Sequence, residues 1–103
     1  MNIGRYKVSP WKDCYGFIGQ ISRYEKSISF KEKEGCVVWV QKYRQNQTKY
    51  KQNQVIISIF FLDAPDLKSY LSSLDNQIFP SIEEAKLKVD NLLEKISKLS
   101  VLL

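Results

Sequence analysis

A strongly apolar stretch near the middle of the 103-residue chain constrains the fold most. Residues 55–62 are Val-Ile-Ile-Ser-Ile-Phe-Phe-Leu, with seven apolar side chains in eight positions, and Asp63-Ala64-Pro65 follows them. A short, β-branched stretch that ends at a turn signal is typical of a strand buried on both faces. It is much shorter than the roughly 20 residues that a helix needs to cross a membrane. We therefore expect it to form the central strand of a sheet.

Length and composition predict one small globular domain spanning residues 1–103. The chain is 44% hydrophobic and 26% charged, which is typical of a folded protein rather than a disordered one. The first six residues, Met-Asn-Ile-Gly-Arg-Tyr, lack the apolar segment of a secretory signal peptide. We therefore expect a cytoplasmic protein with no membrane partner.

Further strands are expected before the apolar stretch, at residues 3–8, 14–22, 27–33 and 36–44. Residues 23–26 are predicted to form a turn between the second and third of these. Glu34-Gly35 is predicted to form a tight hairpin turn, because glycine supplies the positive φ that such turns need. A two-residue loop at this position would place Phe30 opposite Trp39.

Two helices are expected after the apolar stretch. Asp63 is predicted to cap a short helix over residues 64–74, with Pro65 in its first turn. Ser81-Ile82-Glu83-Glu84 matches the capping-box pattern, and an apolar stripe then continues to Leu99, which predicts a helix over residues 82–98. The predicted fold class is α+β: an antiparallel meander of four to five strands, with the short helix and the longer C-terminal helix on one face.

Charge is distributed unevenly along the chain. Residues 1–62 contain 11 Lys and Arg against 4 Asp and Glu, for a net charge of +7, whereas residues 63–103 have a net charge of −2. The predicted strands are therefore basic and the predicted helices mildly acidic. This asymmetry indicates nucleic acid or an acidic protein surface as the partner.

The sharpest candidate site is a basic segment over residues 41–52, which has four basic residues, two tyrosines and no acidic residue. A turn at Asn46-Gln47 would make it a ribbon, pairing Tyr43 with Tyr50, Lys42 with Lys51 and Arg44 with Lys49. Like charges that face each other across strands are unfavourable unless an anion binds them. The predicted nucleic-acid-binding residues are Lys42, Tyr43, Arg44, Lys49, Tyr50 and Lys51. The alternative is a solvated hairpin whose lysines protect a sheet edge.

Catalysis is not expected. The chain has no histidine, so the commonest general base and metal ligand are both absent, and we predict neither a cofactor nor a metal site. Cys14 and Cys36 are expected to be buried free thiols, with a pairing across neighbouring strands as the alternative. Glu83 and Glu84 fall in the first turn of the predicted second helix, where acidic residues favour the helix dipole.

These observations predict a non-enzymatic module that binds nucleic acid or a nucleoprotein through the basic ribbon. The alternative is a protein-interaction module, either a small inhibitor or adaptor or a homodimer. It would act through a sheet edge or through the apolar C-terminal residues 99–103.

Overall fold

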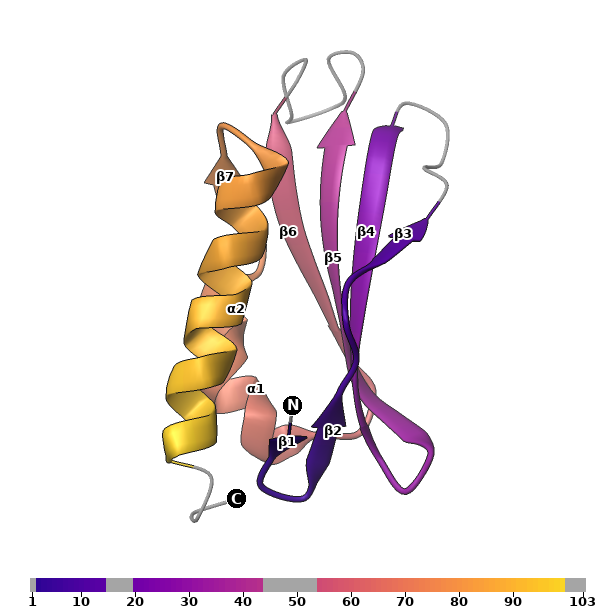
Figure 1. The fold of residues 1–103 in the computed structure, drawn as a ribbon, viewed down its shortest axis with the longest axis vertical. Coiled ribbons are helices and arrows are strands. Elements are labelled where there is room, and N and C mark those ends of the chain that lie inside the picture. Colours follow the sequence, from indigo (N-terminus) through magenta and orange to yellow (C-terminus); the bar gives the residue numbers. More distant parts are fainter. Residues whose placement is uncertain (1, 15–19, 44–53, 100–103) are drawn as a thin grey trace.

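The computed structural model of the chain describes residues 2–14, 20–43 and 54–99. Their fold is α+β, with one antiparallel sheet and two helices, the second of which is C-terminal (Figure 1). The strands are β1 (Asn2–Ile3), β2 (Tyr6–Val8), β3 (Lys12–Cys14), β4 (Gln20–Phe30), β5 (Lys33–Tyr43), β6 (Val55–Phe61) and β7 (Ile78–Phe79). The helices are α1 (Pro65–Leu71), a single 3₁₀ turn η1 (Ser72–Leu74) and α2 (Ile82–Lys98).

The sheet has seven strands, more than the four to five predicted, because short strands pair at both of its edges. Its order is β1-β2-β4-β5-β6-β7, and β3 also pairs with β4. The predicted first strand is a small hairpin instead, since Gly4 adopts a φ of 55° and reverses the chain between β1 and β2.

The strand predicted from the apolar stretch is confirmed as β6, but its expected central position is wrong. β6 pairs with β5 on one side and with the two-residue β7 on the other, so β4 and β5 occupy the middle of the sheet. Side chains of β6 alternate between the two faces, and Phe60 is 46% exposed. The stretch is therefore buried on both faces only in its first half, at Val55, Ile56 and Ile57.

The turn predicted at Glu34-Gly35 is displaced in the structure to Lys31-Glu32. These two residues have φ values of 49° and 66°, and the flanking Phe30 and Lys33 are cross-strand partners. Gly35 lies inside β5 at a register irregularity, where its carbonyl accepts hydrogen bonds from the backbone N–H groups of Leu62 and Asp63. The glycine thus allows β5 to pack closely against the segment that follows β6, and it does not form a turn.

The turn predicted at residues 23–26 is also wrong, because β4 continues without interruption from Gln20 to Phe30. Consequently Trp39 pairs with Glu25, not with Phe30 as predicted, and Phe30 lies at the hairpin end of the sheet. No glycine or proline occurs in residues 23–26 to break the strand.

Both helices pack against the same face of the sheet, and their buried side chains form one core with the strands (Figure 1). The predicted helix over residues 82–98 is confirmed, and the Ser81 side chain accepts a hydrogen bond from the Glu84 backbone N–H at 3.1 Å. The predicted cap of α1 at Asp63 is wrong, since Ala64 occupies the N-cap position with no side-chain cap. Leu99, placed in the predicted apolar stripe, is exposed.

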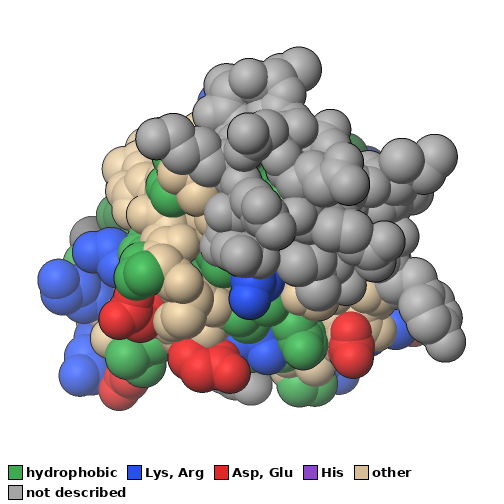
Figure 2. Space-filling model, turned by 90° about the horizontal axis from the view of Figure 1, so that it is seen from above, with side chains coloured by type: hydrophobic (Ala, Val, Ile, Leu, Met, Phe, Trp, Pro, Cys, Tyr) green, Lys and Arg blue, Asp and Glu red, His purple; other side chains and the backbone are tan. Residues whose placement is uncertain are grey.

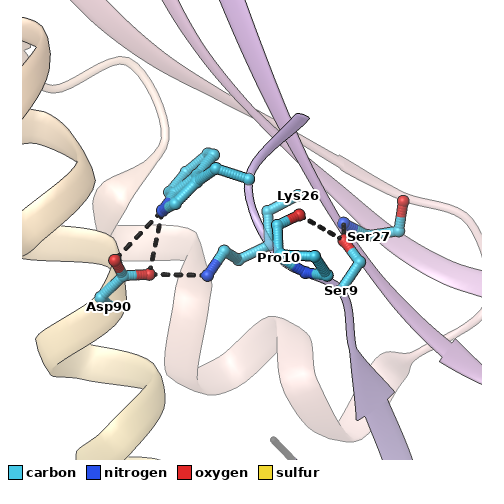
Figure 3. Close-up of polar contacts among 6 residues, drawn as sticks. Ser9, Pro10, Lys26, Ser27 and Asp90 are labelled. Atoms are coloured by element: carbon cyan, nitrogen blue, oxygen red, sulfur yellow. Dashed lines mark hydrogen bonds and ion pairs between the residues drawn. The ribbon is translucent and has the colours of Figure 1, made fainter. Parts of the chain in front are cut away.

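Strands β2 and β3 follow each other along the same side of β4, with an irregularity between them. Lys7 pairs with Ser29, whereas Lys12 pairs with Glu25, so the chain contains one extra residue between the two ladders. The Ser9 hydroxyl holds this segment by accepting from the Ser27 backbone N–H at 2.8 Å and donating to the Pro10 carbonyl at 3.0 Å (Figure 3). The extra residue has the character of a β-bulge.

Candidate functional site

The structure describes only part of the predicted basic ribbon. Arg44, Lys49, Tyr50 and Lys51 lie outside the described residues. Lys42 and Tyr43 are the last two residues of β5.

The ribbon pairing predicted for Lys42 and Tyr43 is wrong. Lys42 aligns with Val55, and the Tyr43 backbone N–H donates to the Gln54 carbonyl at 3.3 Å. These two residues therefore do not face Lys51 and Tyr50. The prediction derived the register from a local two-residue turn, whereas the observed register joins the apolar part of β5 to β6.

Lys42 and Tyr43 belong to opposite faces of the sheet, since successive side chains of a strand alternate. Lys42 shares the core-side face with Val40, and it is half-buried. Tyr43 shares the other face with Gln41, to whose Oε1 its hydroxyl donates a hydrogen bond at 2.8 Å.

The sheet face turned away from α1 and α2, here called the outer face, carries a second set of side chains. The register of β4, β5 and β6 defines it, because residues that pair directly across strands share a face. It comprises Arg23, Glu25, Ser27, Val37, Trp39, Gln41, Ile56, Ser58 and Phe60. None of its four large apolar residues of β5 and β6, Val37, Trp39, Ile56 and Phe60, belongs to the core cluster under the helices.

An aromatic pair lies at the centre of the outer face. The ring centroids of Trp39 and Phe60 are 4.6 Å apart at an interplanar angle of 60°, an edge-to-face contact. The Arg23 guanidinium carbon lies 4.4 Å from the Trp39 ring centroid, within cation–π range. Glu25 fixes the indole by accepting a hydrogen bond from its Nε1 at 2.8 Å. Trp39 is thereby held in place, while much of the Phe60 ring is open to solvent.

A cavity of about 500 Å³ lies beside this aromatic pair, at the irregularity between β2 and β3. Its walls are Ser9, Pro10, Trp11, Lys12, Glu25, Ser27 and Glu34. The cavity and the aromatic pair share Glu25, so they form one continuous site. A volume of this size is within the range of small-molecule pockets, about 300–1,000 Å³.

Two lysines add positive charge to this site. Lys12 lines the cavity, and Lys7 pairs with Ser29 further along β4; both are exposed. An end view of the molecule shows basic, acidic and hydrophobic side chains intermixed over the described surface (Figure 2). The site is distinguished by its aromatic side chains and its cavity.

Sequence reasoning did not assign Arg23, Glu25 or Phe60 to the candidate site. Arg23 and Glu25 fell in a predicted turn, and Phe60 fell in a strand predicted to be buried on both faces. The usable signal was Ser58 within the apolar stretch, because a polar residue between two apolar ones marks a face that is not fully buried.

A second, smaller cavity of about 260 Å³ lies at the hairpin end, lined by Arg5, Tyr6, Phe30, Lys33, Asp63 and Pro65. Its cations already have acidic partners, since Arg5 lies 3.3 Å from Asp66 and Lys33 lies 3.0 Å from Asp63. Asp66 also accepts a 2.6 Å hydrogen bond from the Tyr6 hydroxyl, and burial together with this contact raises the pKa of the Tyr6 phenol. These contacts join the N-terminal hairpin to α1 and leave this cavity little unsatisfied charge.

Both cysteines are free thiols, as predicted, but the predicted burial is confirmed only for Cys36 and is wrong for Cys14. Cys36 is buried, and burial raises the pKa of its thiol to about 12. Cys14 is half-buried. Within residues 2–14, 20–43 and 54–99, no cluster of three or more His, Cys, Asp or Glu could hold a metal ion.

Comparison with models of known protein families gave no match, and neither did comparisons with curated proteins or with solved structures. In the part of the chain that the structure describes, no helix combines the length and apolar character needed to cross a membrane.

Proposed function

We propose that this protein is a non-catalytic, cytoplasmic module that binds nucleic acid through the outer face of its sheet. The observation that carries the proposal is the group formed by Arg23, Trp39 and Phe60, in which the Arg23 guanidinium and the exposed Phe60 ring each contact the half-buried Trp39 indole, on a face that neither described helix covers. This pairing of residue types suits a ligand that alternates negative phosphates with flat aromatic bases.

Two contributions to the binding free energy of a nucleic acid match the side chains of the outer face. Stacking of a base on an aromatic side chain is worth about 1–3 kcal/mol and requires no particular sequence. Phe60 offers that surface, since its ring is 46% exposed. Lys7 and Lys12 are placed to contact phosphates, and each such contact adds a salt-dependent contribution to affinity.

Of the predicted ribbon residues, Tyr43 extends this surface, whereas Lys42 lies on the core-side face and the other four lie outside the described residues. Tyr43 is four residues from Trp39 on the same strand and face, a separation of about 13 Å along a strand. A bound strand of a few nucleotides would span that distance. Charge reversal at Lys42, Arg44, Lys49 and Lys51 tests whether these four residues contribute to affinity.

The first experiment is fluorescence anisotropy with labelled single-stranded DNA, duplex DNA and RNA, across a series of salt concentrations. Two phosphate contacts on a single strand, at Lys7 and Lys12, predict a slope of about −1.4 in log affinity against log salt. Phe60→Ala should weaken binding about tenfold, as expected from the loss of one stacked base. Leu87→Ala is the matched control, because Leu87 is an exposed apolar residue on α2.

A matched charge control separates the outer face from the net charge of the protein. Lys12→Glu and Lys88→Glu make the same charge change, but Lys88 is exposed on α2. The proposal expects a loss of affinity in Lys12→Glu that clearly exceeds the loss in Lys88→Glu. Equal losses, or no binding by the wild-type protein at low salt to any of the three nucleic acids, would reject it.

A non-catalytic role is supported by the chemistry of the available side chains. The chain has no histidine, and the buried Cys36 thiol, with its pKa of about 12, is not a nucleophile at neutral pH.

A protein-interaction module is the second candidate function, and one observation favours it. Phe60 and Leu62 are 46% and 61% exposed and lie two residues apart at the end of β6, so they form an apolar surface. An acidic protein partner or a second copy of the chain could cover it. Light scattering over a range of concentrations tests the homodimer: a monomer at every concentration excludes it. The C-terminal residues 100–103, part of the predicted apolar tail, lie outside the described residues.

A further inference from the structure

The cavity between β2, β3 and β4 differs in its chemistry from the rest of the basic half of the chain. Two of its walls are carboxylates, Glu25 and Glu34, and two are serines, Ser9 and Ser27. Glu34 forms no ion pair with a described residue, and only the Oε1 atom of Glu25 is engaged, by the Trp39 indole. The cavity therefore presents hydrogen-bond acceptors that the protein itself does not use.

Groups that can only accept hydrogen bonds favour ligands that carry hydrogen-bond donors. An ionised carboxylate accepts hydrogen bonds and cannot donate them, so it favours N–H groups and repels carbonyl oxygens. Among the DNA bases, cytosine, adenine and guanine carry an exocyclic amino group, whereas thymine has none and presents carbonyl oxygens. The carboxylates also exclude phosphate groups from the cavity by charge repulsion.

The surroundings of the cavity fit a base whose phosphates remain outside. Lys12 forms part of the cavity wall and is exposed, so its ammonium can reach a phosphate at the opening. Trp11 supplies an aromatic wall, and its indole N–H is engaged with Asp90 of α2 at 3.1 Å. That hydrogen bond fixes the orientation of the ring. The Nζ atoms of Lys26 and Lys86 lie 4.8 and 5.8 Å from the centroid of this ring, so the indole already contacts the protein's own cations and serves as a fixed wall of the cavity.

We propose that this cavity binds one base of a single strand, and that it selects bases with an exocyclic amino group, such as cytosine and adenine, over thymine, which has none. This inference rests on the proposed nucleic-acid-binding function and adds base selectivity to it. Glu34 and Glu25 accept the amino protons, Trp11 forms a fixed wall of the cavity beside the base, and Lys12 contacts the adjacent phosphate. Single strands are the required form, because the amino groups of a duplex are paired on their Watson–Crick edge.

The test compares labelled single strands of about 15 nucleotides made of dC, dA or dT. Wild-type protein should bind dC and dA about tenfold more tightly than dT. Glu34→Gln and Glu25→Gln should each reduce this ratio markedly, without weakening binding to dT, because an amide no longer presents two acceptors. Glu32→Gln is the matched control, since Glu32 lies in the neighbouring turn and does not line the cavity.

The outcomes separate this inference from the function on which it rests. If the protein binds dC, dA and dT equally, or if the preference survives in both cavity variants, base selection by the cavity is wrong and nucleic-acid binding stands. If the protein binds none of the strands, the proposed function fails and this inference fails with it. Amide chemical shifts give an independent readout: addition of cytidine monophosphate should move the Ser27 and Glu34 signals of the wild type more than thymidine monophosphate does.

Discussion

The Nζ atom of Lys26 on β4 lies 2.8 Å from Oδ1 of Asp90 on α2, and the lysine side chain is only 9% exposed (Figure 3). The same carboxylate accepts hydrogen bonds from the indole Nε1 of Trp11 at 3.1 and 3.2 Å. One side chain of α2 therefore holds both β4 and the residue before β3. This contact fixes α2 to the core-side face, and neither described helix covers the outer face.

Asp90→Asn should destabilise the protein, because it leaves the buried Lys26 ammonium without a counter-ion. Removing one partner of a fully buried pair costs about 3–5 kcal/mol, and the 43% exposure of the Asp90 side chain reduces this to about 1–3 kcal/mol. Urea denaturation measures the change. Glu94→Gln, at an exposed position on the same helix, is the control and should change stability by less than about 0.5 kcal/mol. Equal stability of Asp90→Asn and wild type would contradict this role of the ion pair.

Gly35→Ala should also destabilise the protein, for a steric reason. A Cβ atom at residue 35 would lie 3.1 Å from the Ala64 Cβ and 3.2 Å from the Asp63 carbonyl oxygen, closer than ordinary contacts. Overpacking of this kind typically costs about 1–3 kcal/mol. Thermal or urea unfolding provides the measurement, with Glu34→Ala as the control at the neighbouring exposed position. A stability increase in Gly35→Ala would show that the segment after β6 can move away at little cost.

Asp75→Ala should expose part of the β6 edge of the sheet to pairing with other chains. The Asp75 carboxylate accepts a hydrogen bond from the Ile59 backbone N–H at 2.9 Å, next to the position where β7 ends its pairing with β6. Its removal leaves that N–H free, at a cost of about 1 kcal/mol, and offers the edge to other chains. Light scattering after incubation should detect more association than for Ser73→Ala, an exposed control. Unchanged stability and association would mean that water replaces the carboxylate.

Cys36 should resist alkylation in the folded protein and become reactive on unfolding. With a pKa of about 12 against an ordinary value of 9.0, its thiol stays protonated at pH 8, and its burial blocks access. Mass spectrometry after iodoacetamide treatment should find Cys14 modified first. The raised pKa also predicts a pH effect on stability. Above about pH 9 the unfolded state loses the proton that the folded state retains, so this residue lowers stability as pH rises toward 12.

Elements with strong local signals were predicted correctly from the sequence. The Ser81 cap and the apolar stripe from Ala85 to Ile96 identified α2, and the β-branched residues from Val55 identified β6. These signals depend on neighbours within a few residues, so no tertiary information was needed.

The turns and registers required tertiary information. Gly35 was the expected turn residue because glycine readily adopts positive φ. In the structure it packs closely against Ala64 inside β5, and Lys31 and Glu32 adopt the positive φ values of the turn instead. That displacement changed the partner of Trp39 from Phe30 to Glu25. The candidate site was missed for this reason, because it exists only once β4, β5 and β6 are in their observed register.

The extra residue between β2 and β3 determines the electrostatic sign of the binding surface. It places Lys12 on the outer face and Asp13 on the face of Tyr24, next to α2. A one-residue slip of β3 along β4 would remove the irregularity, pair Lys12 with Tyr24, and present a carboxylate where the lysine now stands. The register of three residues at the sheet edge therefore decides whether this surface attracts or repels anions, with the sequence unchanged.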